Sequence, residues 1–288
     1  MKVILLGASG QLGLEWQHFL KKTADDISLV PYNSSQLDIT DTKNVRVEMM
    51  KQQPDTVVNC AAFTNVDGAE EQKELSRKVN VDAAGNLARL SDELDFKLVH
   101  YSTDYVFPGD KEDREKLPEG YAEDFPAGPI NYYGQTKWEG EQLIRDATEN
   151  YLVLRVSWLC GPFGKNFVKT MLKLGRERDK LKVVNDQWGS PAFTENVVEN
   201  SLNLVKADRR GTYHITSKGL ISWYDFAEAI FSFTGVKVEV EPVPSEAFPT
   251  KAKRPHFSKL STDKIEQVSG SRIIDWKVGL KDLLKQLH

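Results

Sequence analysis

The sequence has few of the residues that mark disulfide-rich, metal-stabilised or membrane-anchored proteins. Its 288 residues include only two cysteines, Cys60 and Cys160, with no CxxC pair and no neighbouring histidine. This spacing gives no basis for a disulfide framework or a zinc site, so we expect two buried free thiols. The longest apolar run near the start, residues 3–6, is too short for a signal peptide or a membrane span. We therefore expect a cytoplasmic protein.

A strong excess of charge of one sign is also absent. Thirty-eight lysine and arginine residues against 42 aspartate and glutamate residues give a net charge of −4. This balance argues against a protein that binds nucleic acid or anionic membranes in general. A chain of this length buries roughly 75% of the surface that its unfolded form exposes, so a core can hold it together without a structural metal. The composition predicts a soluble globular protein.

Short apolar runs alternate with helical patterns through the first 160 residues. This alternation is typical of a parallel sheet covered by helices on both faces. We therefore predict an α/β protein with a doubly wound, Rossmann-like parallel sheet over residues 1–160. The predicted strands are 2–6, 27–31, 56–59, 97–101 and 152–156, and the predicted helices are 11–22, 42–52 (with Asp41 as N-cap), 71–94 and 134–148.

The pattern weakens after residue 160, so we predict that residues 161–288 mainly form a smaller C-terminal lobe. We also expect the chain to cross between the two lobes. Two long loops stand out. The loop 108–130 is either a lid or a disordered insertion. The loop 241–261 carries extra lysine and arginine, which either bind an anion or form a solvated face. The predicted helices of this lobe are 165–178, 194–206, 223–234 and 281–287, and its predicted strands are 181–184 and 236–240.

A glycine-rich turn, GASGQLG, follows the first predicted strand and opens a helix. That context is the one in which such glycines bind a dinucleotide. Gly7 permits a tight turn, Gly10 lets the backbone approach a pyrophosphate, and Gly13 lets helix and strand pack closely. The free N–H groups at the helix N-terminus bind phosphate. The alternative is a glycine turn with a structural role alone.

The residues after the second strand bear on the choice of cofactor. Residues 31–35 contain no carboxylate, which would bind the ribose hydroxyls of NAD and repel the 2′-phosphate of NADP. They contain no arginine either, so the sequence favours NADP(H) and leaves NAD(H) open. Asp38 and Ile39 would contact the adenine, or Asp38 would only cap the next turn.

Tyr133 and Lys137 stand four residues apart at the start of a predicted helix. That spacing places them on one helix face, so we expect the ammonium to lie near the phenol and lower its pKa from about 10. A phenol with a lowered pKa is a usable proton donor. An exposed amphipathic pair is the alternative.

Two strand ends add candidates. Thr103 follows the fourth strand, at the sheet edge where parallel sheets bind ligands, and would offer its hydroxyl to a substrate oxygen. Small residues after the third strand leave room for a nicotinamide ring. The predicted cofactor site comprises Gly7, Gly10, Gln11, Leu12, Gly13, Asp38, Ile39, Ala61, Ala62, Phe63, Tyr133 and Lys137.

Longer motifs extend over nearly the whole chain. They are GASGQLG, NCAAFTNVDGAE at 59–70, VNVDAAGNLA at 79–88, STDYVF at 102–107, YGQTKWEGE at 133–141, RVSWLCG, NFVKTML, QWGSP, GTYHITSKGLISWYDFA and the pair Arg254-Pro255. In these motifs the chain resembles the extended short-chain dehydrogenase/reductases and, within them, the dTDP-4-dehydrorhamnose reductases. The combination of VDGAE with STDYVF separates this branch from sugar-nucleotide epimerases and dehydratases better than the glycine motif does.

The resemblance implies reduction of the C4 ketone of dTDP-4-dehydro-β-L-rhamnose by NADPH or NADH, which gives dTDP-L-rhamnose for cell-surface polysaccharide. It implies that Tyr133 donates a proton to the C4 oxygen, that Lys137 holds the nicotinamide ribose, and that Thr103 hydrogen-bonds the reacting oxygen. The substrate contacts that it implies are Thr103, Asp104, Tyr105, Trp158, Asn166 and Arg254.

Some relatives hold a divalent cation between subunits. Glu15 and Glu195 match its positions, but Gln286 stands where a carboxylate is expected. We therefore expect no metal and expect Glu15 to be a solvated charge; a homodimer stays open. Two alternatives to the reductase are a non-catalytic NADP-binding regulatory subunit, like the β subunit of methionine adenosyltransferase, and a reductase or epimerase of another nucleotide sugar. The intact tyrosine, lysine and threonine argue against the regulatory subunit.

Overall fold

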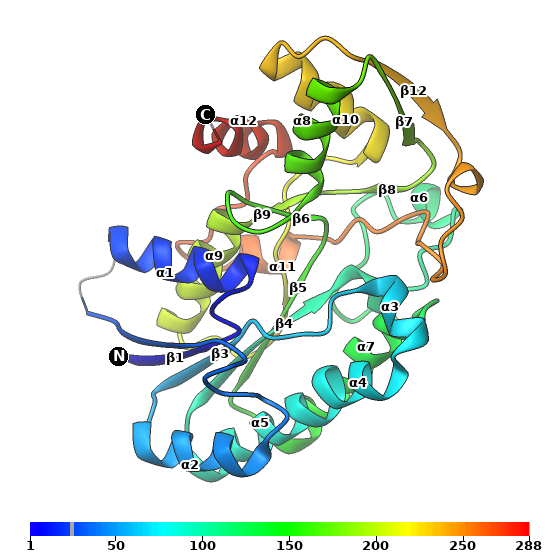
Figure 1. Ribbon diagram of the computed structural model, residues 1–288. Coiled ribbons are helices and arrows are strands. Elements are labelled where there is room, and N and C mark those ends of the chain that lie inside the picture. The colour runs from blue at the N-terminus through cyan, green and yellow to red at the C-terminus, as the bar shows by residue number, and fades with distance from the viewer. Residues whose placement is uncertain (24–25, 288) are drawn as a thin grey trace.

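The computed structural model describes residues 1–23 and 26–287 and has a parallel sheet between two layers of helices (Figure 1). Its six strands lie in the order β10-β5-β4-β3-β1-β2. The chain therefore changes direction across the sheet beside β1, which is the doubly wound arrangement that the sequence predicts. The strands are β1 (Lys2–Leu6), β2 (Ser28–Tyr32), β3 (Thr56–Asn59), β4 (Lys97–Thr103), β5 (Tyr151–Val156) and β10 (Gly211–His214).

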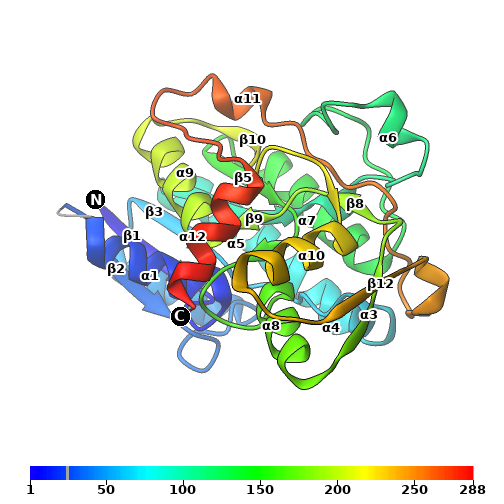
Figure 2. The same ribbon diagram turned by 90° about the horizontal axis from the view of Figure 1, so that it is seen from above.

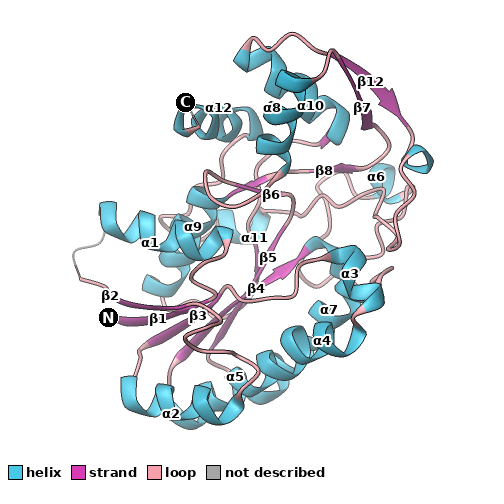
Figure 3. Cartoon of the chain, in the orientation of Figure 1, coloured by secondary structure: helices cyan, strands magenta, loops and turns pink. Residues whose placement is uncertain are grey.

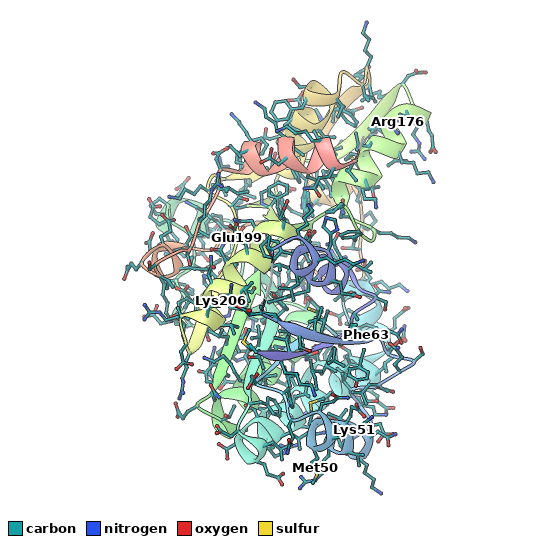
Figure 4. The ribbon with its side chains drawn as sticks, turned by 90° about the vertical axis from the view of Figure 1, so that its left-hand side faces the viewer. Met50, Lys51, Phe63, Arg176, Glu199 and Lys206 are labelled. Carbon is teal, nitrogen blue, oxygen red and sulfur yellow. The ribbon has the colours of Figure 1, made fainter. Side chains whose placement is uncertain are left out.

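Both faces of the sheet are covered, because successive side chains of a strand point to opposite sides. Val3 and Leu5 of β1 pack with α1 and α9 on one face, and Ile4 and Leu6 pack with α2 and α5 on the other. Every residue of β3 and β4 is buried, and the apolar residues at the middle of β3 and the start of β4 are typical of strands covered on both faces. The covering helices are α1 (Gln11–Thr23), α2 (Thr42–Gln52), α5 (Ala83–Leu94), α7 (Tyr132–Ala147) and α9 (Thr194–Lys206), the last of which carries Glu199 and Lys206 in Figure 4.

The helix predicted over 71–94 is wrong as a single element. It consists of α3 (Val66–Glu71), α4 (Lys73–Arg77), the π-helical turn η1 (Lys78–Asp82) and α5. The side-chain amide of Asn80, in the π turn, accepts a hydrogen bond from the Phe63 backbone N–H and donates one to the Phe63 carbonyl oxygen. A Cβ on Gly140 of α7 would lie 2.2 Å from the Asn80 carbonyl oxygen, so that glycine lets the turn approach α7. The π turn therefore ties the loop after β3 to α7.

The second lobe lies above the carboxyl edge of the sheet (Figures 1 and 2). Its core is enclosed by α8 (Phe167–Glu177), α10 (Trp223–Thr234) and α12 (Trp276–Gln286). The last helix begins five residues earlier than predicted because Asp275 caps it by accepting from the Lys277 amide at 2.8 Å. Although α9 and β10 belong to residues 161–288, both pack with the sheet.

Two short strands close the far side of this lobe (Figure 3). They are β7 (Lys180–Val184) and β12 (Glu239–Val243), which pair in parallel. The strand predicted at 236–240 is therefore displaced toward the C-terminus. Lys180 pairs across the two strands, since its ammonium lies 2.9 Å from Glu239 and 3.0 Å from Glu241.

The loop 108–130 is packed and is not the disordered insertion that was one of its two interpretations. It includes the helical turn α6 (Asp113–Lys116), and Tyr121 is buried among Phe107, Phe257 and Leu260. Tyr121 also forms a backbone bridge to Leu260. The loop is thus fastened to the 241–261 segment. Within the described ranges, none of the helices combines the length and the apolar character needed to cross a membrane.

Candidate active site

A cavity of about 760 Å³ opens at the carboxyl edge of the sheet, where the strand order reverses. Such switch points are where open α/β sheets bind ligands. Of the predicted site residues, fifteen line this cavity, and Gly13, Asn166 and Arg254 do not. The fifteen are Gly7, Gly10, Gln11, Leu12, Asp38, Ile39, Ala61, Ala62, Phe63 (labelled in Figure 4), Thr103, Asp104, Tyr105, Tyr133, Lys137 and Trp158.

The glycine turn has the close packing expected of a dinucleotide site. Gly7 adopts φ +75°, and a Cβ there would lie 2.6 Å from the Ala61 backbone nitrogen. Gly13 lies behind the cavity wall, where a Cβ would stand 2.3 Å from the Gly7 oxygen. These two glycines bring α1 against β1 and leave its N-terminal N–H groups at the cavity.

Ser34 and Asp38, in the segment that follows β2, also line the cavity. Asp38 accepts a hydrogen bond from the Thr40 amide at 2.9 Å, so it caps the next turn while it faces the site. Among the lining residues that the structure describes at 31–39, Asp38 is the one acidic side chain. The nearby carboxylate of Glu48, on α2, accepts a hydrogen bond from the Tyr32 hydroxyl at the end of β2.

Thr103 and Tyr133 meet where β4 ends and α7 begins. The Thr103 hydroxyl donates to Asp104 Oδ1 at 2.8 Å and accepts from the Tyr105 amide at 3.2 Å. A Cβ on Gly134 would lie 2.1 Å from the Tyr105 carbonyl oxygen, so this glycine lets the first turn of α7 lie against the strand end. The Tyr133 ring packs edge-on against that of Tyr105, 5.6 Å between centroids.

The prediction that the Lys137 ammonium lowers the pKa of the Tyr133 phenol is wrong in this structure. Burial raises the pKa of the Tyr133 phenol, and hydrogen bonding with Thr103 opposes that shift only in part. The Lys137 ammonium group lies elsewhere: Nζ is 2.6 Å from the Tyr101 carbonyl oxygen and 3.0 Å from Nε2 of His100. Burial lowers the pKa of Lys137 to about 8, and Glu141 offsets part of this shift. The lysine reaches back to β4, whose polar groups satisfy it better than the phenol.

Two polar atoms in the cavity wall are left for a ligand. Ser102 Oγ and Asp104 Oδ2 are buried and have no hydrogen-bond partner within the described part of the chain. Burial also raises the pKa of Asp104 to about 6. Buried polar atoms rarely stay unpaired in folded proteins, so a bound molecule is expected to complete them.

Trp158 lines the cavity from the second lobe with φ +46°, a left-handed conformation that is unusual for a bulky residue. Its ring stacks on that of Trp223 at 3.5 Å and 10°. A Cβ on Gly189 would lie 2.9 Å from the Trp158 ring, so this glycine makes room for it. Such strain at a cavity wall is typical of functional positions.

Asn166 and Arg254 are engaged by the protein itself. Asn166 caps α8 through the Lys169 amide and donates to Gln11 Oε1 at 2.9 Å. Arg254 donates to Asp67 Oδ2 at 2.7 Å. Their roles toward a substrate stay predictions. Two other lysines of the basic loop are also paired, Lys251 with Glu71 and Lys259 with Glu119.

Among the cavity residues that sequence reasoning missed are the polar side chains of Thr64, Ser102 and Lys165. Lys165 is an exposed cation at the rim, on the segment that follows β5 and β6 (Leu159–Cys160). The signal in the sequence is its place beyond the carboxyl end of a parallel strand, the edge at which such sheets bind ligands.

Glu15 is not a solvated charge. It is 1% exposed, because α1 packs on α9, and Oε2 accepts from the Thr194 hydroxyl. Burial raises its pKa. Glu195 accepts from Gln286 Nε2 at 2.9 Å. In the ranges 1–23 and 26–287, His, Cys, Asp and Glu side chains do not gather in threes as a metal site requires.

Both cysteines are free thiols, but only Cys160 is buried as predicted. Cys60 is half-buried and lines the cavity, because it follows directly after β3 at the sheet edge. Burial of its sulfur raises the pKa of this thiol.

The whole chain, residues 1–288, matches the family model described as RmlD substrate binding domain. It is 34% identical over 299 residues to the dTDP-4-dehydrorhamnose reductase of Escherichia coli K12, with 100% of this chain and 98% of that protein covered. It is similar to the solved dTDP-4-dehydrorhamnose reductase of Clostridium acetobutylicum, at 40% identity and a TM-score of 0.94, over 100% of this chain and 99% of that one. It is also similar to the Bacillus anthracis dTDP-4-dehydrorhamnose reductase solved in complex with NADP, at 38% identity and a TM-score of 0.94, over 99% of each chain.

Proposed function

The chain belongs to the RmlD substrate-binding-domain family, and from that membership we propose that it is an NADPH-dependent reductase. Its substrate is dTDP-4-dehydro-β-L-rhamnose, whose C4 ketone it reduces to give dTDP-L-rhamnose for polysaccharide synthesis. The family membership agrees with the resemblance that the motifs carry. Since NADPH and nucleotide sugars are cytoplasmic metabolites, we propose that the enzyme works in the cytoplasm.

The observation that carries the proposal is the convergence of Thr103, Tyr133 and Lys137 on the same cavity as the glycine turn. The cavity fits a dinucleotide, because missing Cβ atoms at Gly7 and Gly13 let the turn approach closely and because the N-terminus of α1 faces inward. Ser34, with no arginine beside it in residues 31–35, leaves the preference for NADPH over NADH to be measured.

When bound, NADPH supplies the hydride for the carbonyl carbon. Tyr133 supplies the proton for the carbonyl oxygen. The raised pKa of its buried phenol keeps it protonated at neutral pH, which suits reduction, because the alkoxide that forms is a far stronger base than a phenolate. The hydroxyl hydrogen of Thr103, now directed at Asp104, turns to the same oxygen when a ketone is bound, since hydroxyls rotate freely.

The remaining residues hold the two ligands. Lys137 holds the nicotinamide ribose from the back of the cavity, and Ala61, Ala62 and Phe63 give the ring a flat wall. We assign the sugar to Asp104, Tyr105 and Trp158, so that residues 161–288 with the end of β5 form the substrate lobe. Asn166 and Arg254 meet the diphosphate once they leave their present partners, and a guanidinium fork suits phosphate oxygens.

The test is loss of NADPH absorbance at 340 nm when dTDP-4-dehydrorhamnose is added to the purified chain. Oxidation that is absent from the Tyr133→Phe variant supports the proposal. Binding of NADPH without oxidation favours the regulatory-subunit alternative. Activity only on 4-keto sugars attached to UDP or GDP overturns the substrate assignment, and the same panel run with NADH settles the cofactor.

A further inference from the structure

The VDGAE motif at residues 66–70 forms most of the short helix α3, which lies beside the start of α7 (Figure 1). Neither of its acidic side chains lines the cavity. Glu70 reaches α7 instead, and its Oε1 accepts a hydrogen bond from the Tyr132 backbone N–H at 2.8 Å. The first N–H groups of a helix have no carbonyl partner within it, and a carboxylate there also suits the helix dipole. Glu70 therefore fastens the first residue of α7 to α3.

The N-cap residue Asn131 satisfies other N–H groups of the same turn. Its Oδ1 accepts from the Gly134 amide at 2.8 Å, and its carbonyl oxygen accepts from the Gln135 amide at 3.0 Å. Its Nδ2 donates to the Lys253 carbonyl oxygen at 2.8 Å. Asn131 directly precedes the helix that it caps, whereas Glu70 is 62 residues from the amide that it binds. The position of this turn relative to α3 therefore depends on Glu70.

The same turn carries the proposed proton donor. Neighbouring residues of a helix point about 100° apart, so Tyr132 and Tyr133 face different surroundings. The Tyr132 ring lies under the Lys73 ammonium of α4, 5.2 Å from ring centroid to Nζ, and Tyr133 lines the cavity. On the cavity side, a Cβ on Gly134 would lie 2.1 Å from the Tyr105 carbonyl oxygen. The first turn of α7 is thus held between the end of β4 and α3.

Helix α3 also continues from the loop that forms the proposed wall for the nicotinamide. Residues 61–63 line the cavity, and Asn65 then caps α3 by accepting from the Gly68 amide at 2.9 Å. The bond from Glu70 to the start of α7 therefore links this wall to Tyr133. In the reduction of a ketone, the hydride reaches the carbon and the proton reaches the oxygen, so the nicotinamide and the phenol must be aligned on one carbonyl group.

Asp67 attaches a third segment to the same helix. It stands one helical turn before Glu70, so the two carboxylates share a face of α3. Asp67 Oδ1 accepts from the Ala252 amide at 3.0 Å, and Oδ2 accepts from Arg254 Nη2 at 2.7 Å. The motif thus joins the basic segment of the second lobe, the wall of the cavity and the start of α7.

We propose that Glu70 is a positioning residue that sets the place of Tyr133 relative to the nicotinamide by holding the first turn of α7 against α3. It lines no part of the cavity and acts through the backbone of the helix. The kinetic consequence rests on the proposed function, which this role of Glu70 deepens.

The kinetic test is the Glu70→Ala variant of the full chain. We expect kcat for NADPH oxidation to fall by roughly 10–100-fold, because a displacement of about 1 Å at a reacting group costs up to about 10² in rate. KM for the nucleotide sugar and the Kd of NADPH should stay within about twofold of wild type. Lys137, one turn further on, keeps its place, since the Tyr101 carbonyl oxygen holds its ammonium at 2.6 Å. A raised KM with an unchanged kcat overturns the proposal.

Two variants of the same helix control this result. Glu70→Gln keeps an oxygen that accepts from the Tyr132 amide, so its kcat should stay within about threefold of wild type. Glu71→Ala removes the next carboxylate, which forms an exposed pair with Lys251, and should leave kcat and KM unchanged. A Glu70→Gln variant as slow as Glu70→Ala contradicts a role through the hydrogen bond.

A double-mutant cycle separates positioning from a general loss of structure. In the Tyr133→Phe chain there is no phenol proton to align, so adding Glu70→Ala should lower the residual kcat by less than about twofold. The same 10–100-fold loss in both backgrounds overturns the proposal, because Glu70 would then act on something other than the phenol.

The place of the Tyr133 ring is also read without turnover, from nuclear Overhauser contacts in the full chain labelled with ¹³C-tyrosine. The rings of Tyr105 and Tyr133 lie 5.6 Å apart between centroids, and the Tyr133→Phe variant assigns the signals. We expect this contact in wild type and in Glu70→Gln, and a weaker one in Glu70→Ala. An unchanged contact in a folded Glu70→Ala variant overturns the proposal.

This spectrum keeps the inference separate from the proposed function. A wild-type chain that oxidises no NADPH refutes the proposed function, and the contact between the two rings then decides the role of Glu70 alone. If Glu70→Ala does not fold, Glu70→Asp takes its place with the same expectations, because its carboxylate is one methylene too short to keep the bond to the Tyr132 amide.

Discussion

The two halves of helix α7 make opposite use of buried charge. In the second half, Glu141 accepts from Arg155 at 2.9 and 2.7 Å and from Arg145 at 2.8 Å. Arg155 also donates to the Glu123 carbonyl at 3.1 Å. In the first half, Tyr133 and Lys137 face a cavity whose wall holds polar atoms with no partner inside the described ranges.

The difference separates a structural cluster from a reactive one on the same element. A buried ion pair with complete hydrogen bonding holds α7 to β5, and it needs no ligand. At the front of the helix, burial shifts the pKa values of Tyr133 and Lys137 and leaves polar atoms of the cavity wall unpaired, so a ligand can complete them. A change to Tyr133 at the front should therefore alter turnover with little effect on stability, and a change to Glu141 at the back should do the reverse.

The largest expected effect is that of Tyr133→Phe. Loss of the proton donor should lower kcat by roughly 10²–10⁴-fold, the range for a lost general acid. NADPH affinity and the free energy of unfolding should stay close to wild type, because the phenol makes no structural hydrogen bond to a charged group. Steady-state NADPH oxidation, NADPH titration and urea unfolding measure kcat, cofactor affinity and the free energy of unfolding in turn. Near-normal turnover would remove Tyr133 from the role.

At the back of the helix, Glu141→Gln leaves Arg155 buried beside a neutral group. We expect the free energy of unfolding to fall by about 3–5 kcal/mol, the usual cost of breaking a buried pair. The control on the same helix is Glu139→Gln, which breaks the exposed pair with Arg77 and should cost less than about 1 kcal/mol. Equal losses in the two variants would show that the buried pair has no special structural role.

Asp104→Asn tests, through the pH dependence of stability, how burial at the front shifts a carboxyl pKa. Burial raises the pKa of Asp104 from 3.8 to about 6, so the folded state holds this proton more tightly than the unfolded state does. Its stabilising effect is complete below pH 4 and is lost as the pH rises through 6. The stability of the asparagine variant relative to wild type should therefore improve from pH 4 to pH 8, by up to about 3 kcal/mol. Urea unfolding of both proteins at pH 4 and pH 8 measures this change. A difference in the free energy of unfolding that is the same at the two pH values contradicts the prediction.

The smallest effect is expected at the rim of the site. Arg254→Ala should raise KM for the nucleotide sugar by about tenfold, the value of one charged hydrogen bond, and should change kcat less. Lys251→Ala removes a nearby exposed ion pair with Glu71 and should leave KM unchanged. A lower kcat at constant KM would place Arg254 in the chemical step.

Much of the fold follows from local sequence. Apolar runs identified the five strands of the N-terminal half because parallel strands are buried on both faces, and the glycine turn fixed where a dinucleotide can approach. The breaks in the helix predicted over 71–94 escaped prediction, since a π turn of five residues is too short to disturb the apolar spacing that indicates a helix. Lys165 was missed because it lies several residues beyond the end of β5 in the sequence, and only the fold brings it to the cavity.

The sequence by itself determined the strand and helix pattern, the glycine turn and the motifs of the family, because each depends on residues close together in the chain. Only the tertiary structure decided that Glu15 is buried, that Lys137 turns to β4 and that Tyr133 keeps its proton. Those outcomes depend on groups brought from distant segments: His100 is 37 residues from Lys137 and 41 from Asn59. Burial and hydrogen-bond direction are properties of that assembled environment, so no local pattern can encode them.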